Sequence, residues 1–344
     1  MSETSKQLKA ALSTYYAAFP SLPDGIYIGL PAERYHADTA LGSSNIRELL
    51  NGANLYWHGS AMNPHRPKEK KTDALAVGDA VHKLLLEGRK AFDAVFVRGP
   101  YGDDDDYSPA EKAALTKSAK SKLQEGQHLL AQADYDFVVD CKSILDTDPK
   151  LKGCLDNALT EVSIFWTRPD GVRVKVRHDA LKLRGIGDIK TIANERRREM
   201  SLACRLDIAT YRYDIPAQHY SNGRLQIAKL LAEGNVFAGE ECAKLDHKNS
   251  ADAAVLEFLK KVAGQKHFGF QLVFIPKKGA PDAWSCTLTP GNPIMVSADG
   301  DIEHAIAVFK GSLERFGHEK RWIPDRDVNE LDINEMPVTF GRRG

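Results

Sequence analysis

Residues 161–191 alternate between apolar and polar side chains with a period of two, and this stretch constrains the fold more than any other. Residues 161–167, 172–177 and 186–191 each predict a short strand, because successive side chains of a strand point to opposite faces. A turn expected around Arg184 and Gly185 joins the last two strands. The sequence therefore predicts a hairpin with one strand before it.

Helical periodicity dominates on both sides of these strands. Residues 74–87 predict a helix that Gly88 ends. Ser108 with Glu111 predicts a capped helix start, with helix continuing in two pieces to about residue 145. Further segments predict helices at 194–233, broken at Asn222–Gly223, and at 301–316, with strands at 268–275 and 283–288. Strands set between helices indicate an α/β fold with a mixed sheet flanked by helices. We expect one domain over 1–344, with residues 1–150 mostly helical and the core in 151–344.

The composition excludes several classes of protein. Lysine and arginine equal aspartate and glutamate, so the net charge is zero, unlike that of a basic DNA-coating protein. The five cysteines are scattered and form no CxxC pair, which indicates thiols in a reducing compartment. The N-terminus has no apolar signal core, and no apolar run approaches the ~20 residues of a membrane helix. We expect a cytoplasmic protein with no membrane association.

The hairpin carries the residues with the clearest chemistry. Asp179 ends one strand, and Asp188 and Lys190 lie two apart on the next, so they share a face while Ile189 points to the core. Hard divalent cations prefer carboxylate oxygens, and such a cation with a lysine suits phosphodiester hydrolysis. The alternative is an exposed hairpin with an ordinary aspartate–lysine ion pair.

Two further groups of residues extend this interpretation. Lys175 and Arg177 share the face of Asp179 and predict a basic track for a DNA backbone. His82 lies in an apolar helix with Gly78 one turn earlier, where a missing side chain allows close approach of another element. His82 is either a metal ligand or a hydrogen-bonded core histidine. As a nitrogen ligand it predicts activity with Mn²⁺ as well as Mg²⁺.

Ser43 and Ser44 precede a short amphipathic helix. They are interpreted either as helix caps or as hydroxyl donors to a phosphate at the helix N-terminus.

Taken together, these segments resemble the PD-(D/E)xK nuclease superfamily, and more closely the phage and prophage exodeoxyribonuclease 8 (RecE-type) group. The resemblance covers most of the chain. It is carried by the following stretches, in chain order: Gly25-Ile26-Tyr27, Tyr35-His36, Leu41-Gly42-Ser43-Ser44, Gly78 to His82, Val174 to Asp179, Ile186 to Thr191, Tyr213-Asp214-Ile215 and Ala217 to Tyr220.

The resemblance implies a restriction-endonuclease-like fold and a metal-dependent exonuclease. Such an enzyme degrades linear double-stranded DNA 5′-to-3′ and leaves 3′ tails for phage-type recombination. By the same resemblance the protein forms a ring of subunits and works with a single-strand annealing recombinase. His82, Asp179, Asp188 and the carbonyl of Ile189 would hold Mg²⁺, and Lys190 would serve catalysis. Glu161 occupies a strand where related nucleases place an acid, its alternative being an edge-strand charge.

The sequence departs from this pattern in two places. Relatives often have a glutamine four residues before a tyrosine, whereas here Pro216 precedes Tyr220 and the glutamine is Gln218. Gln218 and Tyr220 are either contacts to the DNA backbone or helix-surface and core residues. His178 replaces the proline common before the first aspartate, and the carboxylate that would bind metal is retained.

Three other functions are compatible with the sequence. One is an endonuclease or Cas4-like nuclease on the same fold, although the cysteine spacing suits no metal cluster. The second is a catalytically inactive DNA-binding module, against which both aspartates and the lysine argue. The third is a phage structural protein whose hairpin matches by chance.

Overall fold

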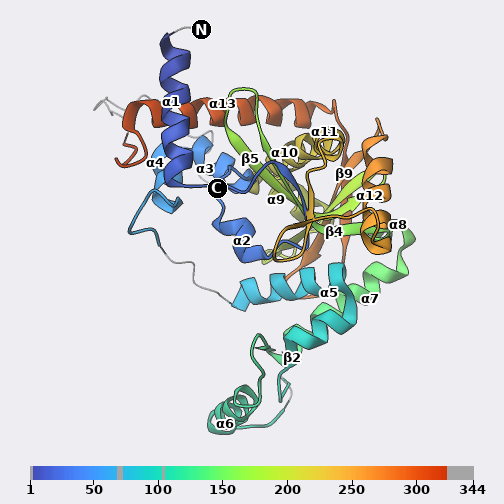
Figure 1. Cartoon of the computed structure of the whole chain (residues 1–344). Helices are drawn as coiled ribbons and strands as arrows, with labels where there is room; N and C mark the ends of the chain where they lie inside the picture. The colour runs from blue at the N-terminus through green and yellow to red at the C-terminus, as the bar shows by residue number, and fades with distance from the viewer. Residues whose placement is uncertain (1–2, 68–72, 103–104, 324–344) are drawn as a thin grey trace.

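The computed structural model describes residues 3–67, 73–102 and 105–323, and an eight-stranded mixed sheet lies at its centre (Figure 1). The strand order is β10-β9-β6-β5-β4-β1-β7-β8. The bounds are β1 Gly25–Ile28, β4 Ala158–Thr167, β5 Arg173–Lys182, β6 Gly185–Ile192, β7 Val236–Ala238, β8 Ala243–Lys244, β9 Gly269–Pro276 and β10 Trp284–Leu288.

The predicted strands and hairpin are confirmed. Strands β4, β5 and β6 are antiparallel neighbours, and only Leu183 and Arg184 separate β5 from β6. Strand β9 then joins β6 in parallel, which makes the sheet mixed. Among the described residues the prediction missed β1, which pairs antiparallel with β4 and parallel with β7. Its four residues are too short for a clear alternation.

Two groups of helices cover the two faces of the sheet. Residues of α10 and α13 pack with Val174 and Val176 of β5, whereas residues of α5 and α7 pack with Ile189 and Val273. The helix bounds are α1 Glu3–Ala18, α2 Ala32–Ala37, α3 Ser43–Asn51, α4 Ala53–Gly59, α5 Asp73–Val95, α6 Pro109–Lys120, α7 Gln132–Thr147, α8 Pro149–Lys152, α9 Met200–Tyr211, α10 Asp214–Leu225, α11 Ile227–Ala232, α12 Ser250–Ala263 and α13 Pro293–Phe316.

An arm projects from this body and is best seen at the bottom of Figure 1. It contains α6 and a two-stranded parallel sheet of β2 Phe96–Arg98 and β3 His128–Leu130. Helix α5 leads into the arm and is interrupted at Gly88, whose φ of 84° and ψ of 176° are not helical. The break predicted at this glycine is confirmed, although helix resumes after it. The capping box of Ser108 and Glu111 is also confirmed.

The predicted break at Asn222–Gly223 is wrong, because α10 runs through both residues. Gly223 instead permits close packing: a Cβ there would lie 2.4 Å from the side chain of Val176. The helix pattern is interrupted earlier, where Arg212 takes a left-handed conformation and ends α9. A glycine inside a helical pattern therefore marks a helix–sheet contact here, not a turn.

No helix in the described ranges is both long and apolar enough to cross a bilayer.

Candidate active site

Three acidic residues lie on three neighbouring strands. The β4–β5 ladder pairs Thr160 with Ala180 and Val162 with His178, so Glu161 and Asp179 oppose each other between these pairs. The β5–β6 ladder ends with Ala180 and Gly187. One residue further along both strands, Asp179 lies opposite Asp188. There the backbone amide of Ile189 donates a hydrogen bond to Asp179 Oδ2 at 2.7 Å. The predicted opposition of the two aspartates is therefore found in the structure.

The backbone of Glu161 interrupts β4 at this point. Its φ of 55° lies in the left-handed region, which costs a residue with a Cβ about 1–2 kcal/mol. The Glu161 carboxylate forms an ion pair with Arg177, whose guanidinium also donates to the carbonyl of Leu30 at 2.8 Å. Backbone strain of this kind is characteristic of functional sites. Here the strained residue is Glu161, the acid on the third of the three neighbouring strands.

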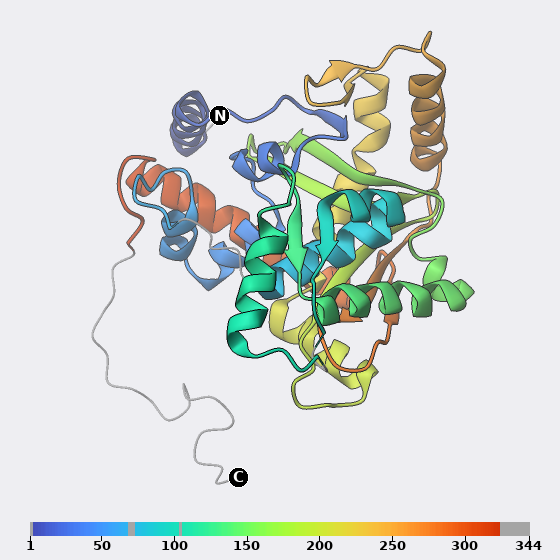
Figure 2. The same ribbon diagram turned by 90° about the horizontal axis from the view of Figure 1, so that it is seen from below.

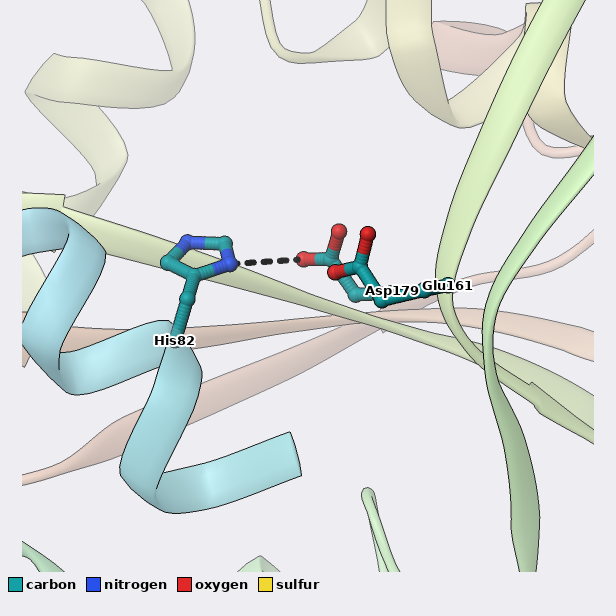
Figure 3. A group of neighbouring side chains, drawn as sticks. All are labelled: His82, Glu161 and Asp179. Carbon is teal, nitrogen blue, oxygen red and sulfur yellow. Dashed lines mark ion pairs between the residues drawn. The ribbon is translucent and has the colours of Figure 1, made fainter. Parts of the chain in front are cut away.

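His82 reaches the acids from α5 (Figure 3). Its Nδ1 lies 3.8 Å from Asp179 Oδ2, and potential ligand atoms of His82, Glu161 and Asp179 all lie within 4.8 Å of one another. In the part of the chain that the structure describes, these three side chains form the group of histidine, cysteine or acidic residues that lie close enough together to hold one cation. Gly78 of the same helix faces Thr191 of β6, where a Cβ on the glycine would lie 3.5 Å from Thr191 Oγ1. The close approach predicted at Gly78 is confirmed.

Asp188 and Lys190 form the inner part of the site. The Asp188 residue is 1% exposed and its carboxylate is ion-paired with the Lys190 ammonium. Lys190 Nζ also donates to the carbonyl of Ile189 at 3.3 Å, while the Ile189 side chain is buried beneath α5 and α7 as predicted. Lys190 thus contacts the Asp188 carboxylate and the Ile189 carbonyl, two groups that the family resemblance implies as metal ligands.

The electrostatics of the site favour a bound cation. Burial raises the pKa of Asp179 and of Asp188 to about 6, against the opposing effect of the nearby Lys190. Burial, followed by the charge of Lys190, lowers the pKa of His82, which favours the neutral imidazole that binds metals. The half-buried Asp179, the buried Asp188 and a neutral imidazole are a donor set that fits a divalent cation. His82, Glu161 and Asp179 would hold it, with Asp188 adjacent.

The acids open onto a cleft of about 760 Å³. Tyr220 of α10 forms part of its wall, and its ring packs against His178 at 5.8 Å between centroids. The remaining lining residues come from β1, the β1–α2 loop, α2, α5, β4 and β5: Ile28, Gly29, Leu30, Pro31, Ala32, Tyr35, His36, Asp79, His82, Lys83, Glu87, Thr160, Glu161, Arg177 and Asp179. The cleft brings Arg177 and Tyr220 close to the acids, and both remain predicted DNA contacts.

The predicted DNA contact of Lys175 is wrong. Lys175 is 4% exposed, and its Nζ donates hydrogen bonds to the carbonyls of Tyr35 at 2.6 Å and Asp38 at 2.7 Å. The ammonium also lies 4.7 Å from the centre of the Tyr35 ring. Lys175 therefore fastens the loop after α2 to the sheet, and it presents no charge to a ligand.

Two other predictions change with the structure. Gln218 donates to Asp299 of α13 at 3.1 Å, so it is directed to a helix–helix contact and not to the acids. Ser43 and Ser44 are not helix caps, because Gly42 is the N-cap of α3 and both serines lie in its first turn. Ser44 is exposed and accepts a hydrogen bond from Arg47 at 3.3 Å.

Residues 52–241 match the family model described as a PDDEXK-like domain of unknown function (DUF3799). The match covers more than half of the chain and includes His82 and all three acids. The chain belongs to this PDDEXK-like family. The PD-(D/E)xK relationship suggested by the hairpin is therefore confirmed.

The fold of this PDDEXK-like protein is similar to a crystal structure described as a "putative exonuclease" from Eubacterium rectale. The TM-score is 0.50 at 14% identity, and the alignment covers 91% of this chain and 99% of the other. This likeness confirms the expected mixed α/β fold. No curated protein matches the chain.

Sequence reasoning missed how the PDDEXK-like core is tied to α10. His178 is buried beside Asp179, and its Nε2 lies 3.0 Å from the carbonyl of Tyr220. His219 makes the equivalent contact with the carbonyl of Lys175 at 3.1 Å. Burial lowers the pKa of each histidine to about 4. The signal available was the position of His178 among the apolar residues of one strand face.

Proposed function

We propose that this protein is a divalent-metal-dependent exodeoxyribonuclease that acts on the ends of linear double-stranded DNA. The observation that carries the proposal is the row of Glu161, Asp179 and Asp188 across three strands, with His82 above it and Lys190 beside it. Membership of a PDDEXK-like family and the likeness to an exonuclease fold support a nuclease. Mg²⁺ is the proposed cofactor, with Mn²⁺ as a substitute because one ligand is a nitrogen.

The residues divide the chemistry between them. A bound divalent cation would polarise the scissile phosphate and lower the pKa of a water molecule. His82, Glu161 and Asp179 would hold that cation, and Asp188 with the Ile189 carbonyl would complete the ligand set. Lys190, already placed on Asp188 and Ile189, orients the attacking water and offsets negative charge that develops on the phosphate.

The finer features of the proposal rest on the RecE-type resemblance. They are 5′-to-3′ polarity, 3′ single-stranded products for recombination, a ring of subunits and a single-strand annealing recombinase as partner. The single domain proposed over 1–344 is supported by a sheet that draws strands from Gly25 to Leu288.

An endonuclease on the same fold is the main competing function. A Cas4-like enzyme has less support, because the cysteines at 141, 154, 204, 242 and 286 are all free and none belongs to the ligand cluster found in the described residues.

One assay separates these functions. Linear duplex labelled at either the 5′ or the 3′ ends is incubated with the protein and Mg²⁺ beside a covalently closed circle. We expect mononucleotide release from the 5′-labelled ends and an intact circle. Linearisation or nicking of the circle at a comparable rate would replace the exonuclease proposal with an endonuclease.

A further inference from the structure

A pair of stacked tyrosines lies where α9 meets α10. The ring centroids of Tyr211 and Tyr213 are 5.8 Å apart with an interplanar angle of 27°. Tyr211 is 52% exposed, which places it among the most exposed large hydrophobic residues described. Its outer ring face therefore adds little to the core and is available to another flat group.

The inner ring of this pair lies beside Lys190. Lys190 Nζ lies 5.4 Å from the centre of the Tyr213 ring. Tyr213 also packs against Phe274, which is the partner of Lys190 in the β6–β9 ladder, at 6.0 Å between centroids. The two rings thus form a short row that begins at Lys190 and ends at an exposed face.

The segment that carries both rings is held from two sides. Arg47 of α3 donates to the carbonyl of Tyr211 at 2.8 Å. Arg212, the left-handed residue between the tyrosines, pairs with Asp214 at 2.8 Å and with Asp301 of α13 at 2.5 Å. The exposed ring is consequently preorganised, which reduces the entropy lost when a ligand stacks on it.

We propose that Tyr211 and Tyr213 form a stacking platform for the base of an unpaired nucleotide next to the scissile phosphate. The proposal rests on the nuclease function proposed above and names the form in which the strand enters. Bases stack on aromatic side chains irrespective of sequence because every base has a π face. Paired bases inside a duplex have both faces covered by their neighbours, so the platform takes its base from the end of a strand, and we assign it to a base that fraying or an overhang has released from its pair. Arg47 adds positive charge beside the platform.

Binding without cleavage provides the first test. The probe is a duplex with a short overhang that carries 2-aminopurine at its first unpaired position, on the 5′ or the 3′ strand, in the presence of EDTA. Stacking on tyrosine quenches 2-aminopurine fluorescence. We expect quenching by the unaltered protein and by Tyr211→Phe, and loss of quenching with about tenfold weaker binding for Tyr211→Ala.

A matched variant controls for the loss of any exposed aromatic residue. Tyr107 is 44% exposed in the segment before α6, and Tyr107→Ala should quench and bind like the unaltered protein. Equal quenching by Tyr211→Ala and the unaltered protein would overturn the platform. So would an equal loss in Tyr107→Ala, because the effect would then not be specific to Tyr211.

Kinetics with Mg²⁺ provide the second test. Tyr211→Ala should raise KM for the overhang substrate about tenfold and leave kcat within about twofold, while Tyr211→Phe keeps both values. A fall in kcat with unchanged KM would contradict a substrate-binding role. If no variant cleaves DNA but quenching depends on Tyr211 as expected, the hydrolytic proposal fails and the platform stands.

Discussion

The site has an open part and an enclosed part, and they differ in how their charges are balanced. His82, Glu161 and Asp179 face the cleft, where Glu161 is paired with Arg177 and the Asp179 carboxylate lies 3.8 Å from the His82 imidazole, whose pKa burial lowers. Asp188 is buried and already carries its own cation in Lys190. From this comparison we propose a division of roles: the open part would bind metal, and in the enclosed part Asp188 would set the position and charge of the lysine and complete the ligand set.

The largest effect should come from the enclosed part. Asp188→Asn keeps the shape of the side chain but removes the charge that holds Lys190 and completes the ligand set. Cleavage should fall on the order of 10³-fold or more, with duplex binding and the thermal unfolding temperature largely retained. The measurement is single-turnover cleavage together with a binding isotherm. Cleavage near the unaltered rate would remove Asp188 from the site.

The next effect should separate the lysine from the metal. Lys190→Ala should lower the rate of the chemical step about 10²- to 10⁴-fold, with the metal concentration for half-maximal activity changed little. A metal titration of single-turnover rates measures both quantities. The proposed division of roles would be wrong if Lys190→Ala showed normal turnover at saturating metal and only weaker metal binding.

The open part should respond in the opposite way. His82→Ala removes a proposed nitrogen ligand and should weaken Mn²⁺ binding by at least about tenfold, with part of the rate restored at high metal concentration. Isothermal titration with Mn²⁺ and with Mg²⁺ checks this. The unaltered protein should cleave with either ion. Failure of Mn²⁺ to support cleavage where Mg²⁺ does would return His82 to the role of a core histidine.

The last predicted effect is a pH dependence shared by both parts, which is small near neutral pH and grows below pH 6. Because the pKa values of Asp179 and Asp188 are raised to about 6, protons compete with metal below that pH. The affinity for Mn²⁺ should fall by up to about tenfold per pH unit for each protonated group below pH 6.

In the metal-free protein, the same raised pKa values make low pH favourable for folding, whereas low pH is unfavourable for metal binding. A carboxyl with a raised pKa binds its proton more tightly in the folded state, so its stabilising contribution is complete below about pH 4 and is lost as pH rises through 6. The contribution of these two groups to the melting temperature of metal-free protein should therefore be smaller at pH 7 than at pH 4.5, and saturating metal should reduce the difference. Metal affinity that stays constant from pH 7 to 5 would contradict the raised pKa values.

The hairpin and its acids were predictable because they depend on local rules. A period of two and a short turn set the register that places Asp179 opposite Asp188. His82 could be assigned to a metal site only through the family resemblance, because a single histidine in an apolar helix can equally be a hydrogen-bonded core residue. The long-range contacts were not predictable. Lys175 is buried by the carbonyls of Tyr35 and Asp38, more than 130 positions away in the chain.

Backbone conformation explains the remaining differences. Nothing in the residues around Glu161 signals a left-handed conformation, because it arises from the fit of β4 against β5. Similarly, Gly223 resembles a helix breaker in sequence, and only the adjacent Val176 reveals that its small size serves packing. Local patterns thus specify which elements form, and neighbouring elements decide which side chains reach the cleft.

Gly88 divides α5 into two rods. The first rod carries the imidazole and approaches β6 closely at Gly78, whereas the second leads into the projecting arm (Figure 1), which Figure 2 shows from below. The second rod is also held to the body, because Phe92 is buried in the same hydrophobic cluster as Val81 of the first rod and Ile189 of β6. The direction in which the chain leaves the sheet therefore depends on a glycine with a φ of 84°, a conformation in which a residue with a side chain at position 88 would be strained.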